Sequence, residues 1–111
     1  MSGLADGAGV VLALVSCPDE ETALAIARAM VGERLAACVN VTGRVRSVYR
    51  WQGAVEEADE RLLVVKLRAD RLEPLAARLV ELHPYDVPEL LVFPVERGLG
   101  PYLEWVRSED G

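Results

Sequence analysis

The sequence predicts an α+β domain in which helices pack on a β-sheet. Two segments, at 18–35 and 70–83, repeat their apolar residues with the period of an amphipathic helix. The segments around them are short apolar runs or alternate polar with apolar residues, as strands do. The resulting order is strand, helix, strand, strand, helix, strand.

Length and composition indicate one folded domain. The chain has 111 residues, enough for a core without disulfides, and 51% of them are hydrophobic. Residues 1–8, rich in Gly, Ala and Ser, are expected to form a flexible leader, and 9–108 a single domain. The net charge of -6, from 18 acidic and 12 basic residues, argues against a nucleic-acid partner, which requires a basic face.

No segment of the sequence predicts a membrane span or a secretion signal. The apolar run at 10–15 is too short to cross a bilayer, and the N-terminus lacks a basic region. Cys17 and Cys38 could pair once, but a reducing compartment is expected without a signal peptide. We therefore expect a cytoplasmic protein with no membrane partner.

The first strand and helix follow from residues 9–32. Residues 9–16 are a continuous apolar run, which is typical of a buried central strand. Asp19 is placed to cap the helix, and Glu20 and Glu21 suit the dipole of its first turn. One helical face is apolar and comprises Ala23, Ile26, Ala27, Met30 and Val31.

The middle of the chain predicts a long β-hairpin that turns at Gln52-Gly53. Residues 36–51 alternate in polarity, with a bulge predicted at Thr42-Gly43, and 54–68 form the returning strand. Counting outward from the turn sets Arg46 opposite Asp59. Arms of about 15 residues, against about 5–6 in an average strand, must extend beyond a small domain.

The overhang of this hairpin predicts self-association. An isolated two-stranded ribbon is only marginally stable in water. This one carries Val48, Tyr49, Trp51 and Val55, and a neighbouring copy would cover them. We therefore expect a homo-oligomer with these four residues at its interface.

The second half completes the pattern. The helix at 70–83 has an apolar stripe, and Asp70 with Glu73 resembles a capping box at its start. An apolar strand follows at 89–95, and 101–109 is predicted to be a short helix. This order is the split βαβ arrangement of the ferredoxin-like fold, a βαββαβ sandwich.

Five segments in this order resemble one known family. They read CPDEETALAIA, ERLAACVNV, SVYRWQG, LHPYDVPELL and YLEW, and together they resemble the CutA divalent-cation tolerance proteins over roughly residues 10–107. The resemblance implies a ferredoxin-like fold, a homotrimer similar to the PII signalling proteins, and an association with copper and other divalent cations. Some bacterial members carry a copper-associated cysteine two residues further upstream than Cys17, where this chain has Val15.

Three residues are candidate metal ligands. His83, the only histidine, either caps the helix at 70–83 or ligates Cu²⁺, with Glu89 or Asp86 adding oxygen. Cys17 lies at a helix N-terminus, where a thiolate is stabilised, and is either a soft ligand or an ordinary strand-end residue. Cys38 alternates with apolar residues and is expected to pack.

The sequence leaves two function classes open. Because the chain has one histidine and none of the common catalytic motifs, catalysis is not expected. The first hypothesis is a trimeric copper-binding protein of metal tolerance. The alternative is a PII-like sensory or scaffold trimer whose inter-subunit clefts bind a metabolite or a protein, with Tyr85, Trp105 and Lys66 as candidate cleft-lining residues.

Overall fold

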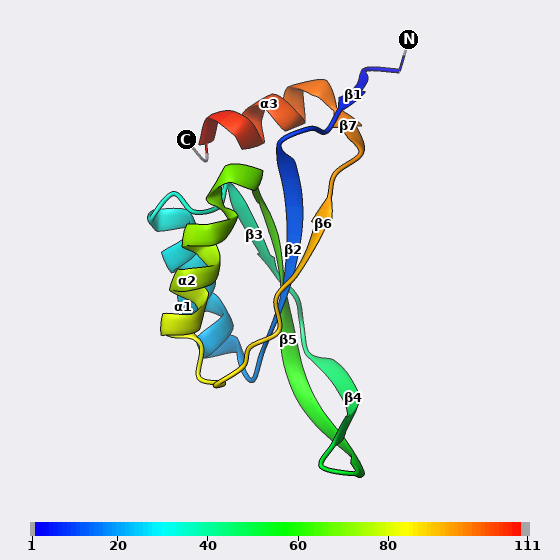
Figure 1. Cartoon of the computed structure of the whole chain (residues 1–111), viewed down its shortest axis with the longest axis vertical. Coiled ribbons are helices and arrows are strands. Elements are labelled where there is room, and N and C mark those ends of the chain that lie inside the picture. The colour runs from blue at the N-terminus through cyan, green and yellow to red at the C-terminus, as the bar shows by residue number, and fades with distance from the viewer. Residues whose placement is uncertain (1, 110–111) are drawn as a thin grey trace.

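The structure is a computed structural model that describes residues 2–109, and Figure 1 shows its arrangement. The strands are β1 (Leu4–Asp6), β2 (Val10–Cys17), β3 (Cys38–Val41), β4 (Val45–Trp51), β5 (Ala54–Arg68), β6 (Leu91–Pro94) and β7 (Arg97–Leu99). The helices are α1 (Glu20–Gly32), the 3₁₀ turn η1 (Ala69–Arg71), α2 (Leu72–Leu82) and α3 (Gly100–Glu109). No helix in the described part of the chain is long and apolar enough to cross a membrane.

The main sheet has the antiparallel order β3-β5-β2-β6, and β4 pairs with the other half of β5. Helices α1 and α2 lie on one side of this sheet, while β4 and β5 extend beyond it as a two-stranded ribbon (Figure 1). The fold is therefore the predicted ferredoxin-like α+β class with an overhanging hairpin. The molecule is elongated, with extents of 50 × 29 × 22 Å.

The register of the hairpin agrees with the count made from its turn. Arg46 lies opposite Asp59, and Val45 lies opposite Glu60. The predicted bulge is an interruption that separates β3 from β4. There Thr42 replaces a ladder contact, because its Oγ1 accepts a hydrogen bond from the Leu62 amide at 2.9 Å.

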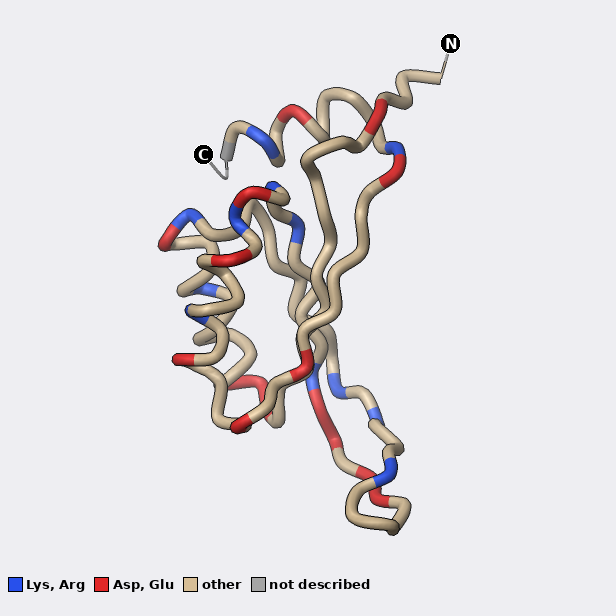
Figure 2. Tube along the Cα trace, viewed as in Figure 1, with Lys and Arg blue, Asp and Glu red and all other residues tan. Residues whose placement is uncertain are grey.

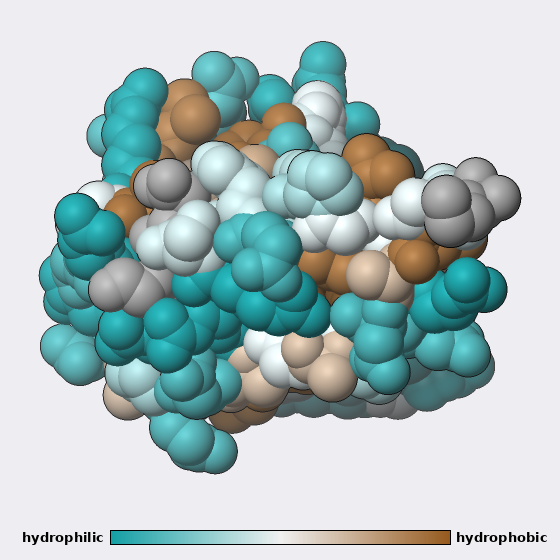
Figure 3. All heavy atoms as spheres, turned by 90° about the horizontal axis from the view of Figure 1, so that it is seen from above, coloured by the Kyte–Doolittle hydropathy of each residue, from teal (hydrophilic) through white to brown (hydrophobic). Residues whose placement is uncertain are grey.

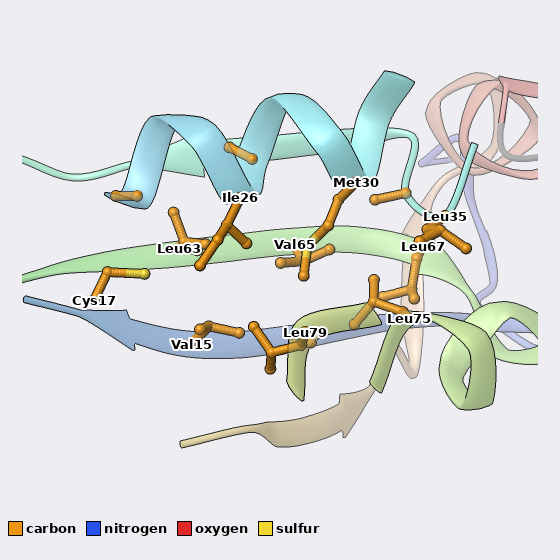
Figure 4. Packing of buried hydrophobic residues seen from close by; sticks show 14 of the residues in the cluster. Val15, Cys17, Ile26, Met30, Leu35, Leu63, Val65, Leu67, Leu75 and Leu79 are labelled. Carbon is orange, nitrogen blue, oxygen red and sulfur yellow. The ribbon is translucent and has the colours of Figure 1, made fainter. Parts of the chain in front are cut away.

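The core lies between the two helices and one face of β2 and β5 (Figure 4). Alternate residues of these strands point toward the helices and are completely buried: Ala13, Val15, Cys17, Leu63, Val65 and Leu67. Ile26 and Met30 of α1 and Leu75 and Leu79 of α2 pack on them. Figure 4 shows the sulfur of Cys17 among these side chains, at the end of β2.

The opposite face of the sheet has little cover. Helix α3 packs on Val10 through Leu103 and Val106, but Leu12 and Leu14 further along β2 are only half-buried. The edge strand β6 is exposed along its whole length, including Phe93 at 46%. Seen from above, hydrophobic residues also reach the surface between hydrophilic ones at the α3 end (Figure 3).

The predicted flexible leader over residues 1–8 requires correction. Strand β1 pairs with β7, with Leu4 opposite Leu99, and Arg107 donates from Nη2 to the carbonyl oxygens of Asp6 and Ala8 at 3.2 and 3.0 Å. The backbone at Gly7 passes close to that of Val95, and only glycine fits there, since a Cβ would lie 2.0 Å from the carbonyl oxygen of Val95. Met1 lies outside the described residues. A three-residue strand is too short to show an alternating pattern.

Of the two predicted helix caps, the one at α1 is present and the one at α2 is absent. Asp19 caps α1 as expected, because its Oδ1 accepts from the Thr22 amide at 2.8 Å. The predicted capping box at α2 is absent: Asp70 lies in η1 and pairs with Arg68, and α2 has no side-chain cap. The strand predicted at 89–95 is shortened to β6.

Two neighbouring positions on α2 test this core. Leu79 is 1% exposed and Val80 is 61% exposed. We expect Leu79→Ala to lower the free energy of unfolding by about 2–5 kcal/mol, because it leaves a cavity under the sheet. Val80→Ala should change it by less than about 0.5 kcal/mol. Chemical denaturation at fixed protein concentration measures both, and equal effects would show that the core is not packed as described.

Candidate functional site

An open cleft lies beside the hairpin. It has a volume of about 930 Å³ and is lined by Ser16, Tyr49, Trp51, Glu56, Ala58, Glu60, Pro84, Tyr85, Asp86, Val87 and Glu89. These residues come from the end of β2, from one face of the β4–β5 ribbon and from the segment at 84–89 between α2 and β6. Four of them are carboxylates, three are aromatic, and neither Lys nor Arg is among them.

The outer part of the cleft, defined by Tyr49, Trp51 and Glu56, comes from the hairpin alone. Tyr49 lies directly opposite Glu56 in the ladder, so their side chains share one face of the ribbon. Partial desolvation and then the neighbouring Glu56 carboxylate raise the pKa of the Tyr49 phenol. The phenol therefore remains a protonated donor beside a negative charge.

The inner part of the cleft, defined by Glu60, Tyr85, Asp86 and Glu89, joins the hairpin to the 84–89 segment. The Tyr85 hydroxyl donates to Oε2 of Glu60 at 3.2 Å. Desolvation and then the charge of Glu60 raise the pKa of Tyr85, so this donor is kept at neutral pH. The bond fixes the spacing between the two walls of the cleft.

His83 supports the cleft from behind. It is the C-cap residue of α2, is only 6% exposed, and its ring lies 4.8 Å from that of Tyr85 between centroids. Nδ1 accepts from the Tyr85 amide at 3.1 Å, which assigns the proton to Nε2, 2.7 Å from the carbonyl oxygen of Ser16. Both ring nitrogens are therefore engaged, and the ring fastens the 84–89 segment to the end of β2.

Of the two interpretations of Cys17, the structure favours the strand-end residue over the stabilised thiolate, because Cys17 is the last residue of β2. Its side chain is completely buried, and this burial, followed by the charges of Asp19 and Glu60, raises its pKa to about 11. Desolvation and two nearby carboxylates thus outweigh the dipole of α1. A protonated thiol in the core is a poor metal ligand.

The candidate ligands do not form a closed metal site within one chain. Asp86 and Glu89 line the cleft with Glu56 and Glu60, whereas His83 lies behind its wall. Within residues 2–109, no group of three or more His, Cys, Asp or Glu side chains is arranged to hold a metal ion. The single chain therefore presents an open acidic surface.

Comparisons with known proteins decide the family. Residues 11–109 match the family described as CutA1 divalent ion tolerance protein. The chain belongs to this family. The Divalent-cation tolerance protein CutA of Thermus thermophilus is 47% identical over 98 residues, which cover 88% of this chain and 95% of that protein. Human Protein CutA is 44% identical over 107 residues, 96% of this chain, which spans only 59% of the human protein's length.

Solved structures of CutA proteins confirm the fold. The structure of CutA from Synechococcus elongatus superposes with a TM-score of 0.93 at 35% identity, and 97% of this chain and 96% of that one are covered. The CutA structure from Xylella fastidiosa gives a TM-score of 0.91 at 40% identity, covering 94% of this chain and all of that one, 100%. This chain therefore has the CutA fold along nearly its whole length.

Some of the residues that the sequence proposed for an interface or a cleft line this cleft, and others lie elsewhere in the CutA fold. Tyr49, Trp51 and Tyr85 line the cleft, as does Glu89. Trp105 does not, because it lies on α3 with its ring 5.7 Å from that of Tyr102. Lys66 lies on the domain half of β5, with Nζ 3.9 Å from Sγ of Cys38. Val48 and Val55 face away from the cleft and are 63% and 66% exposed.

The sequence reasoning missed that the acidic run of β5 divides between two faces. Glu57 and Asp59 pair with Arg46 at 3.1 and 3.0 Å, in agreement with the predicted position of Arg46 opposite Asp59. Glu56 and Glu60 point to the other side and line the cleft. The alternation of a strand, applied to the predicted register, contains the signal that separates them.

The two cysteines provide a test of the buried thiol. In Cys38→Ser, Cys17 is the only thiol, and we expect no reaction with a thiol reagent at pH 8 in the folded protein and one reacted thiol per chain in denaturant. Fast reaction of the folded variant would contradict the raised pKa.

The raised pKa of Cys17 also predicts a pH dependence of stability. As pH rises from 9 to 11, the unfolded thiol ionises before the folded one, so the free energy of unfolding should fall. Cys17→Ala should lack this part of the decrease.

Proposed function

We propose that this chain is a trimeric divalent-cation-binding protein of metal tolerance, with copper among the cations that it binds. The observation that carries the proposal is the acidic cleft. Four carboxylates surround one open volume, and no lysine or arginine lines it to compensate their charge. Membership of the divalent ion tolerance family supports the same function, in binding rather than catalysis.

Oxygen atoms of the inner cleft are the proposed ligands. Glu60, Asp86 and Glu89 supply carboxylates, which suit hard and borderline cations, and Cu²⁺ accepts such oxygen donors alongside imidazole. His83 would add its Nδ1 only by releasing the Tyr85 amide. A copy of the chain packed against the cleft, or movement of the 84–89 segment, would complete the coordination.

The uncovered apolar surface supports the proposed trimer. Val48, Trp51 and Val55 on the hairpin are 63%, 58% and 66% exposed, and Leu91 and Phe93 on β6 are also exposed. Burial of apolar surface contributes about 25 cal/mol per Å². Copies that cover one another's hairpins and edge strands would remove this surface from water.

A second candidate function rests on the aromatic lining. Tyr49, Trp51 and Tyr85 give the cleft the character of a site for an organic ligand or a protein segment, as expected for a sensory or scaffold trimer. The acidic lining favours a cationic ligand over an anionic metabolite. Saturable thermal stabilisation by an organic cation without metal would favour this candidate over the first.

The compartment stays a prediction. We propose the cytoplasm from the sequence, but relatives carry names from other compartments. One from Arabidopsis thaliana, 40% identical, is named chloroplastic, and the structure of one from Archaeoglobus fulgidus, 29% identical, is titled periplasmic.

Copper binding is tested by titration with Cu²⁺ followed by calorimetry and native mass spectrometry. We expect Glu89→Gln to weaken the affinity at least about tenfold, because it removes a proposed ligand charge. Glu73→Gln is the control, since Glu73 is exposed on α2 and no ion pair involves it among the described residues. Equal affinities of the two variants would show that the cleft is not the cation site.

His83 needs a separate measurement, because its ring supports the structure. We expect His83→Ala to lower the melting temperature, since the Ser16 carbonyl and the Tyr85 amide lose their partner. If the ring is also a ligand, copper affinity falls as well. Unchanged affinity in a folded variant would remove His83 from the proposed ligand set.

The trimer is tested by native mass spectrometry and light scattering, which should give three times the chain mass of 12.1 kDa. Val55→Asp, on the hairpin, should shift the protein toward smaller species. Val80→Asp is the matched control, because Val80 on α2 is 61% exposed and Val55 is 66% exposed. A wild-type monomer at micromolar concentration would contradict the proposal.

A further inference from the structure

The hairpin is a ribbon with two chemically different faces. One face carries Tyr49, Trp51, Glu56 and Glu60 and lines the cleft. Because side chains alternate along a strand, the other face carries the residues between these, namely Arg46, Val48, Arg50, Val55, Glu57 and Asp59. Figure 2 shows the basic residues of this ribbon gathered along β4 and the acidic ones along β5.

Arg50 has no ion pair among the described residues, unlike Arg46 in β4 and Arg44 just before it. Arg44 lies 3.6 Å from Asp59, and Arg46 pairs with both Glu57 and Asp59. Arg50 lies opposite Val55, and the structure of residues 2–109 gives it no ion pair. Its guanidinium is therefore a positive charge without a partner, next to the exposed valines.

The cleft has carboxylates without a cationic partner, which complements the unpaired Arg50. Glu56 and Glu60 interact with the phenols of Tyr49 and Tyr85, which are neutral. No ion pair with lysine or arginine is formed by these two glutamates, Asp86 or Glu89 among the described residues. One face of the ribbon thus has an unpaired cation, and the other has unpaired anions.

We propose that Arg50 of one copy inserts into the outer part of the cleft of the next copy, against Glu56 and beside Tyr49 and Trp51. The proposal rests on the trimer of the proposed function and names a contact that closes it. Opposite faces of the same ribbon make the contact, so it is head-to-tail, and such contacts close into a ring when the rotation allows.

The ladder places the two partners at matching heights. The pair Arg50–Val55 is directly next to the pair Tyr49–Glu56. In a ring whose axis runs along the ribbon, residues of equal height meet, and Arg50 then faces Glu56. A guanidinium forms charge-assisted hydrogen bonds with a carboxylate and stacks on aromatic rings, so the lining of the outer cleft fits it.

This contact leaves the inner cleft free. Glu60, Asp86 and Glu89 stay available for a cation, and the inserted arginine becomes part of the wall of their site. Assembly and cation binding therefore use different ends of one cleft, so removing a ligand at the inner end should leave assembly intact.

Charge exchange tests the contact. We expect Arg50→Glu and Glu56→Arg each to raise the concentration at which the trimer dissociates by at least about tenfold, because like charges then meet in the interface. The double variant Arg50→Glu/Glu56→Arg restores opposite charges in every contact and should recover most of the loss. Dilution followed by native mass spectrometry gives the dissociation concentration.

Arg28→Glu is the matched control. Arg28 is exposed on α1, has no ion pair among the described residues, and its substitution changes the net charge as Arg50→Glu does. Circular dichroism confirms that each variant is folded. Single variants that behave as the control does, or a double variant no better than the two singles combined, would overturn the contact.

The same samples separate this inference from the proposed function. A wild-type monomer would overturn both the trimer and the contact. A wild-type trimer that the charge exchange leaves intact overturns the contact alone. Loss of copper binding in Glu89→Gln with assembly unchanged supports the separation of the two ends, whereas loss of assembly in that variant would contradict it.

Discussion

The register of one hairpin controls both faces of this molecule. The turn at Gln52-Gly53 has φ values of 49° and 81°, the left-handed geometry of a type I′ turn, which matches the twist of paired strands. Glycine adopts it without strain, while glutamine costs about 1–2 kcal/mol there. A slip of one residue would exchange the faces of β5. It would turn Leu63 and Val65 away from the helices and Glu56 away from the cleft.

Because β5 is a single strand of 15 residues, the domain and the overhang share this constraint. Its domain half is held in register by eight residue pairs with β2, from Cys17–Arg61 to Val10–Arg68. The core therefore specifies which side of the ribbon each hairpin residue faces, even where the ribbon has no second layer. Packing in the domain therefore determines which hairpin residues line the cleft.

Features of the fold and the cleft could be predicted from the sequence where they depend on residues close together in the chain, and not where they depend on tertiary contacts. The Asp19 cap and the Arg46–Asp59 pair follow from local rules, because they depend on a helix start and on counting from a turn. The cleft does not, because the 84–89 segment meets the hairpin through tertiary contacts such as the hydrogen bond between Tyr85 and Glu60. The pKa of Cys17 is raised first by burial and then by the charges of Asp19 and Glu60, and both the burial and Glu60 come from tertiary packing.

His83 shows why its two sequence interpretations compete physically. A ligand needs a free nitrogen lone pair, but here Nδ1 accepts from the Tyr85 amide, while Nε2 lies 2.7 Å from the Ser16 carbonyl oxygen. The backbone groups that the ring satisfies belong to the cleft wall and to its floor. A cation that recruited Nδ1 would release the Tyr85 amide and loosen the wall holding Glu89. Coordination by oxygen atoms alone leaves that wall intact, so in the proposed cation site the carboxylates are the primary ligands and His83 is their support.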